Sequence, residues 1–171
     1  MPESASQVLY TPAQRARRDA TAWTLVQGVL APVQFLIFGI SLYLVLTSLQ
    51  TGEHTDWALA SVVLKTVVLY AIMITGAIWE KVVFDCYLFA PAFFWEDVVS
   101  MGVMALHTAY VWVWWQGQWP ATDQLLLALA AYGSYAINAA QYIRKLRMAR
   151  LQKPTASETP SLSPSGAQAS T

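Results

Sequence analysis

Long uncharged runs alternate with short polar stretches along this chain and predict helices that cross a lipid bilayer. The apolar runs cover residues 23–49, 57–79, 98–115 and 125–143, and only Lys65 interrupts them with a charge. Each run reaches the roughly 17–25 residues that a helix needs to span the hydrocarbon core. We therefore expect an all-α integral membrane protein, built as a bundle of four transmembrane helices.

The stretch from Glu80 to Trp95 does not continue this pattern. It combines charged residues with a dense group of aromatic ones, and Pro91 interrupts it. A proline argues against one continuous helix, while the aromatic residues argue against a loop that lies wholly in water. We expect an interfacial or partly re-entrant aromatic segment between the second and third spans.

Polar residues recur at a fixed spacing inside the first span. Gln27, Gln34, Ser41 and Ser48 follow one another every seven residues. This spacing places them in one stripe along a helix, because seven residues make nearly two turns. Such a stripe faces protein or water rather than lipid, and hydrogen bonding between helices is the simpler of these two interpretations.

Composition narrows the class of protein further. The 171 residues are 56% hydrophobic and only 12% charged, which fits one membrane domain better than a soluble one. The net charge is zero, so nothing favours binding of nucleic acid. Cys86 is the only cysteine, and no Cys/His spacing typical of a metal site occurs, so we expect no metal site.

The basic residues predict how the chain is organised and oriented. We expect a basic N-terminal segment at 1–22, a membrane domain at 23–151 and a disordered tail rich in Ser, Thr and Pro at 152–171. In a four-span arrangement, every Lys and Arg except Lys65 lies on one side, namely Arg15, Arg17, Arg18, Lys81, Arg144, Lys145, Arg147, Arg150 and Lys153. The positive-inside rule then predicts that both termini lie in the cytoplasm.

Acidic residues gather where the second span ends and the third begins. These are Glu80, Asp85, Glu96 and Asp97. Their simplest role is structural, since acids favour the positive end of a helix dipole. Their aromatic surroundings favour a second role, because two neighbouring acids in apolar surroundings retain a proton that one of them can donate.

Two ionisable residues lie deeper in the predicted spans. Glu96, Ser100 and His107 share one helix face, and His107 is about 16 Å from Glu96 along the axis. His107 is either a hydrogen-bonded core histidine or a group that transfers protons. The depth of Lys65 in the membrane differs from that of His107 by no more than about two helical turns. Lys65 either packs against other helices or extends its charge to the interface, or it contacts a substrate.

Four stretches of the chain resemble a known enzyme family. They are TPAQRARRDAT at residues 11–21, WTLVQGVLAP at 23–32, MITGAIWEK at 73–81 and LFAPAFFWED at 88–97. Together they resemble the 3-vinyl (bacterio)chlorophyllide hydratases, small integral membrane enzymes of bacteriochlorophyll synthesis in phototrophic bacteria. The resemblance extends from about Leu9 to Leu151. Residues 82–87 match least, so we expect no catalytic role for Asp85 or Cys86.

The resemblance implies a reaction and a location. Water would add to the vinyl group on ring A of a chlorin, giving a 1-hydroxyethyl group, so the enzyme would be a hydro-lyase. The magnesium would arrive with the pigment, and no cofactor of the protein's own is expected. The partners would be the chlorin pigment, the lipid bilayer and other enzymes of pigment synthesis. The location would be the bacterial inner membrane or the intracytoplasmic photosynthetic membrane.

Physical reasoning then gives candidate roles for particular residues. Glu96 or Asp97 would protonate the vinyl group, and Glu80 or His107 would activate water. Lys81 or Lys65 would meet the free propionate of the pigment, and Phe93, Phe94 and Trp95 would stack against its ring system. The alternative is a pigment-binding or assembly subunit without enzymatic activity, in which His107 would be an axial ligand of magnesium.

Overall fold

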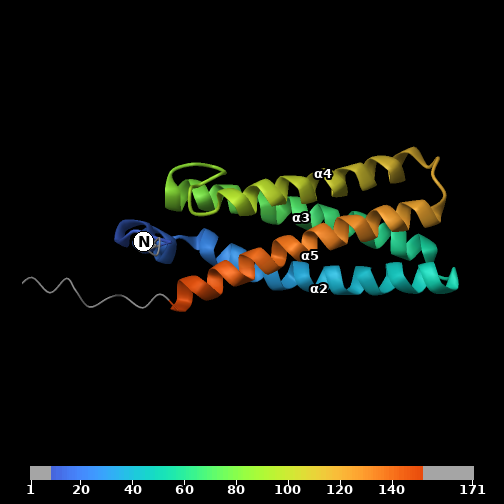
Figure 1. The fold of residues 1–171 in the computed structure, drawn as a ribbon, viewed down its shortest axis with the longest axis horizontal. Coiled ribbons are helices and arrows are strands. Elements are labelled where there is room, and N and C mark those ends of the chain that lie inside the picture. Colours follow the sequence, from blue (N-terminus) through green and yellow to red (C-terminus); the bar gives the residue numbers. More distant parts are fainter. Residues whose placement is uncertain (1–8, 152–171) are drawn as a thin grey trace, which may run out of the picture.

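The fold is an all-helical bundle. The computed structural model describes residues 9–151, which form five helices joined by short connections (Figure 1). The helices are α1 (Pro12–Ala20), α2 (Ala22–Thr51), α3 (Thr55–Phe84), α4 (Phe94–Gln116) and α5 (Ala121–Leu151). The expected N-terminal segment 1–22 is described only in part, and the expected disordered tail lies outside the described residues.

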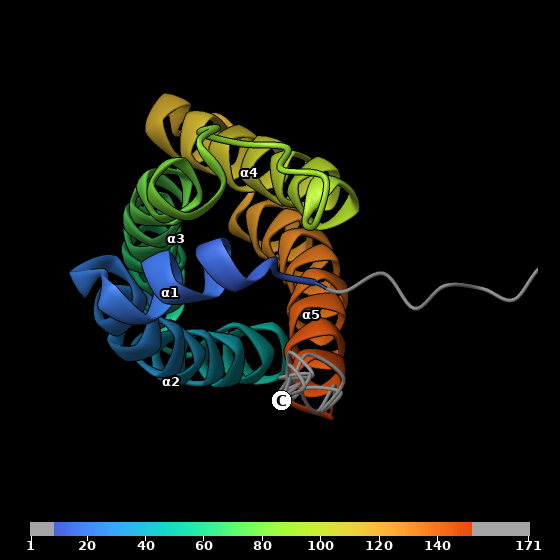
Figure 2. The same cartoon turned by 90° about the vertical axis from the view of Figure 1, so that its left-hand side faces the viewer.

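The four long helices are arranged as two hairpins. Helix α2 packs mainly against α3, and α4 packs mainly against α5. Figure 2 shows the four helices as a ring viewed from one end, with the short α1 lying across that end. The α1 helix contacts α3, and the α3–α4 connection and the end of α5 lie at the same end of the bundle (Figure 1).

Three of these helices are long and apolar enough to cross a membrane. They are α2, α3 and α4, as judged from the described residues. This confirms the prediction of an all-helical membrane protein. Helix α5 is as long as the others but does not reach the same apolar average, because its inward face carries Gln124, Tyr132, Asn138 and other polar residues.

The connection between α3 and α4 is shorter than expected. The prediction that the chain is irregular from Glu80 to Trp95 was wrong at both ends, since α3 continues through Phe84 and α4 begins at Phe94. Helix α3 stops where Asp85 adopts a left-handed conformation, with φ of 69°, and donates its N–H to the carbonyl of Lys81. Within the stretch from Glu80 to Trp95, only residues 85–93, around Pro91, are irregular.

The polar stripe of α2 connects this helix to its neighbours. Gln27 donates to Thr75 of α3 over 2.7 Å, and Ser41 lies 2.6 Å from Ser61 of α3 and 2.5 Å from the hydroxyl of Tyr132 in α5. Gln34, Ser41 and Ser48 are buried. The interpretation of this stripe as hydrogen bonding between helices is therefore confirmed.

A lysine and a histidine form the deepest polar contact between the two hairpins. The ammonium of Lys65 in α3 lies 3.0 Å from Nε2 of His107 in α4, and both side chains are fully buried. His107 Nδ1 donates to the carbonyl of Val103, so Nε2 is the nitrogen that accepts from Lys65. The ammonium also lies 3.7 Å from the centre of the Tyr135 ring in α5. One cation thus holds α3, α4 and α5 together.

The two members of this pair should respond differently to replacement. In His107→Phe the buried ammonium loses its acceptor, which costs about 1–3 kcal/mol, whereas Lys65→Met replaces the cation by an apolar chain of similar length. We expect a larger drop in thermal stability in detergent for His107→Phe than for Lys65→Met. The double variant should be more stable than His107→Phe alone, and equal losses in all three variants would contradict the pairing.

Candidate active site

Two buried acids meet where α3 ends and α4 begins. Glu80 lies in the last turns of α3 and is 5% exposed, while Asp97 lies in the first turn of α4 and is 1% exposed. Their side chains are within hydrogen-bonding reach of each other. The sequence predicted this gathering of acids, and the fold brings these two into contact from separate helices.

The irregular connection covers the pair and is bonded to it. We call residues 85–93 the strap. The backbone N–H of Phe89 donates to Oδ2 of Asp97 over 2.8 Å, and the N–H of Ala90 donates to Oε2 of Glu80 over 3.3 Å. Phe89 has a φ of 60°, which is uncommon for a residue with a side chain. The two acids therefore hold the strap in a conformation that its sequence does not favour.

A second set of polar groups reaches the pair from α5. The hydroxyl of Tyr142 donates to Oδ1 of Asp97 over 3.1 Å, and it lies within hydrogen-bonding reach of Ser100. Nδ2 of Asn138 donates to Oγ of Ser100 over 2.8 Å, and Ser100 in turn donates to the carbonyl of Glu96. A continuous chain of polar groups thus leads from the acid pair into the bundle.

The hydrogen bonds of the two acids differ in a way that bears on their charge. Asp97 accepts from Phe89 and from Tyr142, so both of its oxygens receive a donor, whereas one oxygen of Glu80 receives the N–H of Ala90. Two adjacent carboxylates buried this deeply repel each other, and together they hold a proton. Hydrogen-bond donors stabilise the charged form, so the geometry favours an ionised Asp97 and a protonated Glu80 that donates to it.

Glu96 occupies a different environment from its neighbour. Its carboxylate lies 2.6 Å from the ammonium of Lys145 in α5, and the two side chains are partly exposed. The Lys145 ammonium also lies 4.9 Å from the centre of the Phe93 ring. Glu96 is therefore paired with a cation, whereas the described partners of Glu80 are the Ala90 N–H and Asp97.

The aromatic residues near the pair divide into an enclosed and an exposed group. Phe93 is 3% exposed and packs among Tyr10, Trp79, Phe84 and Tyr142. Phe94 and Trp95 are 43% and 71% exposed and stack edge to face on each other. Of the three aromatic residues predicted to contact a pigment, Phe94 and Trp95 therefore offer an open surface.

The charged and nucleophilic groups around the strap are also paired or shielded. Lys81 forms an ion pair of 2.9 Å with Asp85, and the hydrogen bond from Lys81 lowers the pKa of that carboxyl. Burial raises the pKa of the Cys86 thiol, and the nearby Glu80 and Asp97 raise it further. Cys86 thus remains a neutral thiol beside the acid pair.

The structure separates the other predicted residues from this site. His107 lies ten residues beyond Asp97 on α4, which corresponds to about 15 Å along the axis, and Lys65 is paired with it. No role was predicted for Tyr142 or for the N–H groups of Phe89 and Ala90. The signal in the sequence that could have found Tyr142 is the spacing of Tyr135, Asn138 and Tyr142, which places them near one face of α5.

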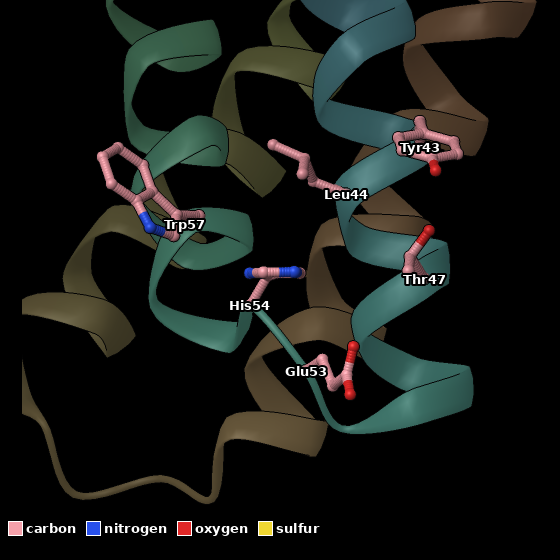
Figure 3. Close-up of a pocket in the computed structure, with 6 residues that line it drawn as sticks. All are labelled: Tyr43, Leu44, Thr47, Glu53, His54 and Trp57. Atoms are coloured by element: carbon pink, nitrogen blue, oxygen red, sulfur yellow. The ribbon is translucent and has the colours of Figure 1, made fainter.

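A surface pocket lies at the opposite end of the bundle, near the α2–α3 turn. Figure 3 shows its lining, which consists of Tyr43, Leu44, Thr47, Glu53, His54 and Trp57. None of these residues belongs to the acid pair. Within residues 9–151, no group of three His, Cys, Asp or Glu side chains is close enough to hold a metal ion.

The fold and the site define a class of protein, a helical membrane protein with a buried carboxyl pair suited to acid–base chemistry. Residues 10–148 match the family model described as 2-vinyl bacteriochlorophyllide hydratase, so the chain belongs to that family.

Two curated relatives support the same assignment. A 2-vinyl bacteriochlorophyllide hydratase of Cereibacter sphaeroides is 67% identical over 143 residues, which cover 84% of this chain and 89% of the relative. One of Rhodobacter capsulatus is 64% identical over 144 residues, covering 84% of each chain. No solved structure matches the chain at a significant level.

Amide substitution should affect stability differently at the two acids, because Glu80 is expected to hold the proton and Asp97 to be ionised. Glu80→Gln mimics a protonated acid, because its amide can donate to Asp97 and its oxygen can accept from Ala90. We expect its unfolding temperature in detergent at neutral pH to match that of the native chain. In Asp97→Asn, the amide oxygen can accept from the Phe89 N–H, but the NH₂ then faces the Tyr142 hydroxyl, which must turn to accept and loses its own acceptor; this loss should cost about 1–3 kcal/mol. The reverse order of stability would place the proton on Asp97.

Proposed function

We propose that this protein adds water to the vinyl group of a bacteriochlorophyllide, giving a 1-hydroxyethyl group, with Glu80 and Asp97 as its acid and base. The protein is a hydro-lyase of bacteriochlorophyll synthesis, as the family and its curated members indicate. The observation that supports the site is that two buried carboxyl groups lie close together, an arrangement that favours a proton held between them.

The proposed chemistry begins with transfer of a proton to carbon. Glu80 donates its proton to the terminal carbon of the vinyl group, the carbon–carbon double bond becomes a single bond, and a cation forms on the carbon attached to the ring. The macrocycle delocalises this charge. Water then bonds to the cationic carbon and gives up one proton to Asp97. The pair again holds one proton, now on Asp97, and its shift to Glu80 restores the starting state.

In this scheme the protein positions the reactants and supplies a general acid and a general base. A well-placed general acid contributes roughly 10²–10⁴-fold to the rate. The proposed steps use no redox chemistry, and the magnesium arrives in the pigment. The assignment exchanges the roles first expected for Glu80 and Asp97, since the hydrogen bonds favour Glu80 as the proton carrier.

The exposed aromatic residues provide a surface on which the pigment can stack. Phe94 and Trp95 lie next to Asp97 in the first turn of α4, and Tyr87 and Phe89 of the strap are also exposed. We propose that the ring system stacks here and that the strap moves aside, which gives the vinyl group access to the acid pair. In this movement the exposed part of the strap around Tyr87 and Phe89 would release the two backbone hydrogen bonds that tie it to the acids.

The two lysines considered as partners of the pigment's propionate differ in their distance from the acid pair. Lys81 follows Glu80 directly, and its ammonium is exposed at the strap. Lys65 lies fifteen residues before Glu80 on α3, which corresponds to about 22 Å, more than a chlorin can bridge while its vinyl group contacts the acid pair. We therefore propose Lys81 for this role and a structural role for Lys65.

The competing role of His107 as a magnesium ligand finds no support in the geometry. A histidine binds a metal through a ring nitrogen with a free lone pair. Nε2 of His107 accepts from Lys65, and Nδ1 donates to Val103. Both nitrogens are therefore engaged.

The setting of the enzyme follows from its charges. We propose that α5 crosses the bilayer as a fourth span, that both termini are cytoplasmic, and that the membrane is the bacterial inner or intracytoplasmic one. Residues 23–151 would form the membrane domain, and the strap would lie at the cytoplasmic interface. The basic residues of α1, of the end of α3 and of the end of α5 share one end of the bundle, which supports this orientation (Figure 1).

Conservative variants of the three acids test the catalytic roles. We expect Glu80→Gln and Asp97→Asn each to lower turnover of vinyl bacteriochlorophyllide roughly 10²-fold or more, because each removes one proton-transfer step. Glu96→Gln is the matched control on the same helix and should change turnover less than tenfold. The measurement is hydroxyethyl product formed per amount of folded, pigment-binding protein. A large loss confined to Glu96→Gln would move the proton donor to Glu96.

Reporter fusions test the arrangement in the membrane. Fusions at Gly52 and Gly117, which end α2 and α4, should report the periplasm, because the loops there contain no Lys or Arg. A fusion within the strap should report the cytoplasm. A cytoplasmic signal at Gly117 with a periplasmic signal at Gly52 would show that α4 does not cross.

A further inference from the structure

One buried amide in the polar chain behind the acid pair has an oxygen without a partner. Asn138 of α5 is 8% exposed, and its Oδ1 accepts no hydrogen bond from any residue that the structure describes. A buried acceptor without a partner costs about 1–3 kcal/mol, and such groups in native proteins call for an explanation.

The orientation of this amide follows from its neighbours. Nδ2 of Asn138 lies 2.8 Å from Oγ of Ser100, whose hydroxyl donates to the carbonyl of Glu96. Ser100 therefore accepts at this contact, and the group facing it must be the NH₂ of the amide. Oδ1 is thus the atom that remains available as an acceptor.

The position of this oxygen relates it to the proposed chemistry. Asn138 lies one helical turn before Tyr142, whose hydroxyl donates to Asp97. Tyr142 is also within reach of Ser100, the partner of Asn138. The free acceptor therefore lies within one turn of the residue that bonds to the proposed base.

Two other buried amide oxygens also lack a described partner. In the part of the chain described, Oε1 of Gln141 and Oε1 of Gln34 likewise have no partner, and Gln34 is within reach of Tyr135, one turn before Asn138. A buried acceptor of this kind can be satisfied by a small molecule that donates hydrogen bonds. Water is such a molecule, and buried water is commonly held by two to four polar groups.

We infer that Oδ1 of Asn138 binds the water molecule that adds to the vinyl group. One hydrogen of the water bonds to Asn138 and the other to Asp97, so that a lone pair of its oxygen points to the cationic carbon. As the carbon–oxygen bond forms, Asp97 takes the second hydrogen as a proton, and Asn138 keeps its hydrogen bond to the new hydroxyl group. This role rests on the proposed function, because it assigns the second reactant of that reaction.

The two halves of the reaction can be measured separately in heavy water. Reversible protonation of the vinyl group by the acid pair places deuterium on the terminal carbon of recovered substrate, whereas hydration yields the hydroxyethyl product. In Asn138→Leu an apolar chain replaces the acceptor and excludes water. We expect hydration to fall at least tenfold while deuterium exchange per folded protein persists, so that the ratio of exchange to hydration rises. Asn138→Ala should raise the same ratio and serves if the leucine variant does not fold.

A matched control lies at the other end of α5. Gln124 is also buried, and its Oε1 also lacks a described partner, but it is close to Trp119 and far from the acid pair. Gln124→Leu should leave the ratio unchanged. A ratio that stays unchanged in both Asn138 variants, or that rises equally in Gln124→Leu, would overturn the role of Asn138.

The same measurement distinguishes a failure of this role from a failure of the acid pair. Glu80→Gln should lose exchange and hydration together, because it cannot protonate the vinyl group. If Glu80→Gln keeps both rates, the acid pair is not the proton donor, whatever Asn138 does. If Glu80→Gln loses both rates, the acid pair is supported as the proton donor. If the Asn138 variants then lose both rates in the same proportion, the water-binding role of Asn138 is wrong.

Discussion

Polar side chains inside this apolar bundle must find their partners in one another, because the lipid around them offers none. The rest of the structure depends on this constraint. Ser41 joins α2 to α3 and α5, and Lys65 joins α3 to His107 of α4 and to the ring of Tyr135 in α5. These contacts fix the rotation of each helix about its axis, which packing of aliphatic side chains alone would leave less defined.

The same constraint places the candidate active site at one end of the bundle. Glu80 and Asp97 face inward because their helices are already oriented by the deeper contacts. The strap supplies two N–H donors and α5 supplies Tyr142, so the acids are satisfied without a neighbouring cation. A lysine at this position would hold both acids ionised, and neither could then donate a proton. Lys145 instead pairs with Glu96.

A reaction that consumes water inside a membrane protein needs both a dry site and a controlled supply of water. The strap is bonded to the acid pair, and Phe93 packs in a cluster of rings beside it, while Asn138 of α5 has a buried acceptor without a described partner. Exclusion of bulk water strengthens the electrostatic interactions of the pair. An ordered water molecule held by Asn138 would then be the one available to the cation.

The sequence by itself determined the class of protein, the apolar spans and the inward stripe of α2, because these depend on local periodicity and composition. It also located the acids near the end of the second span. Only the tertiary structure decided that Asp97, rather than Glu96, contacts Glu80, since adjacent residues on a helix point about 100° apart and the packing of α3 and α5 selects between them. The roles of Tyr142, of the strap N–H groups and of Asn138 depend on contacts between distant segments, which periodicity along one helix does not encode.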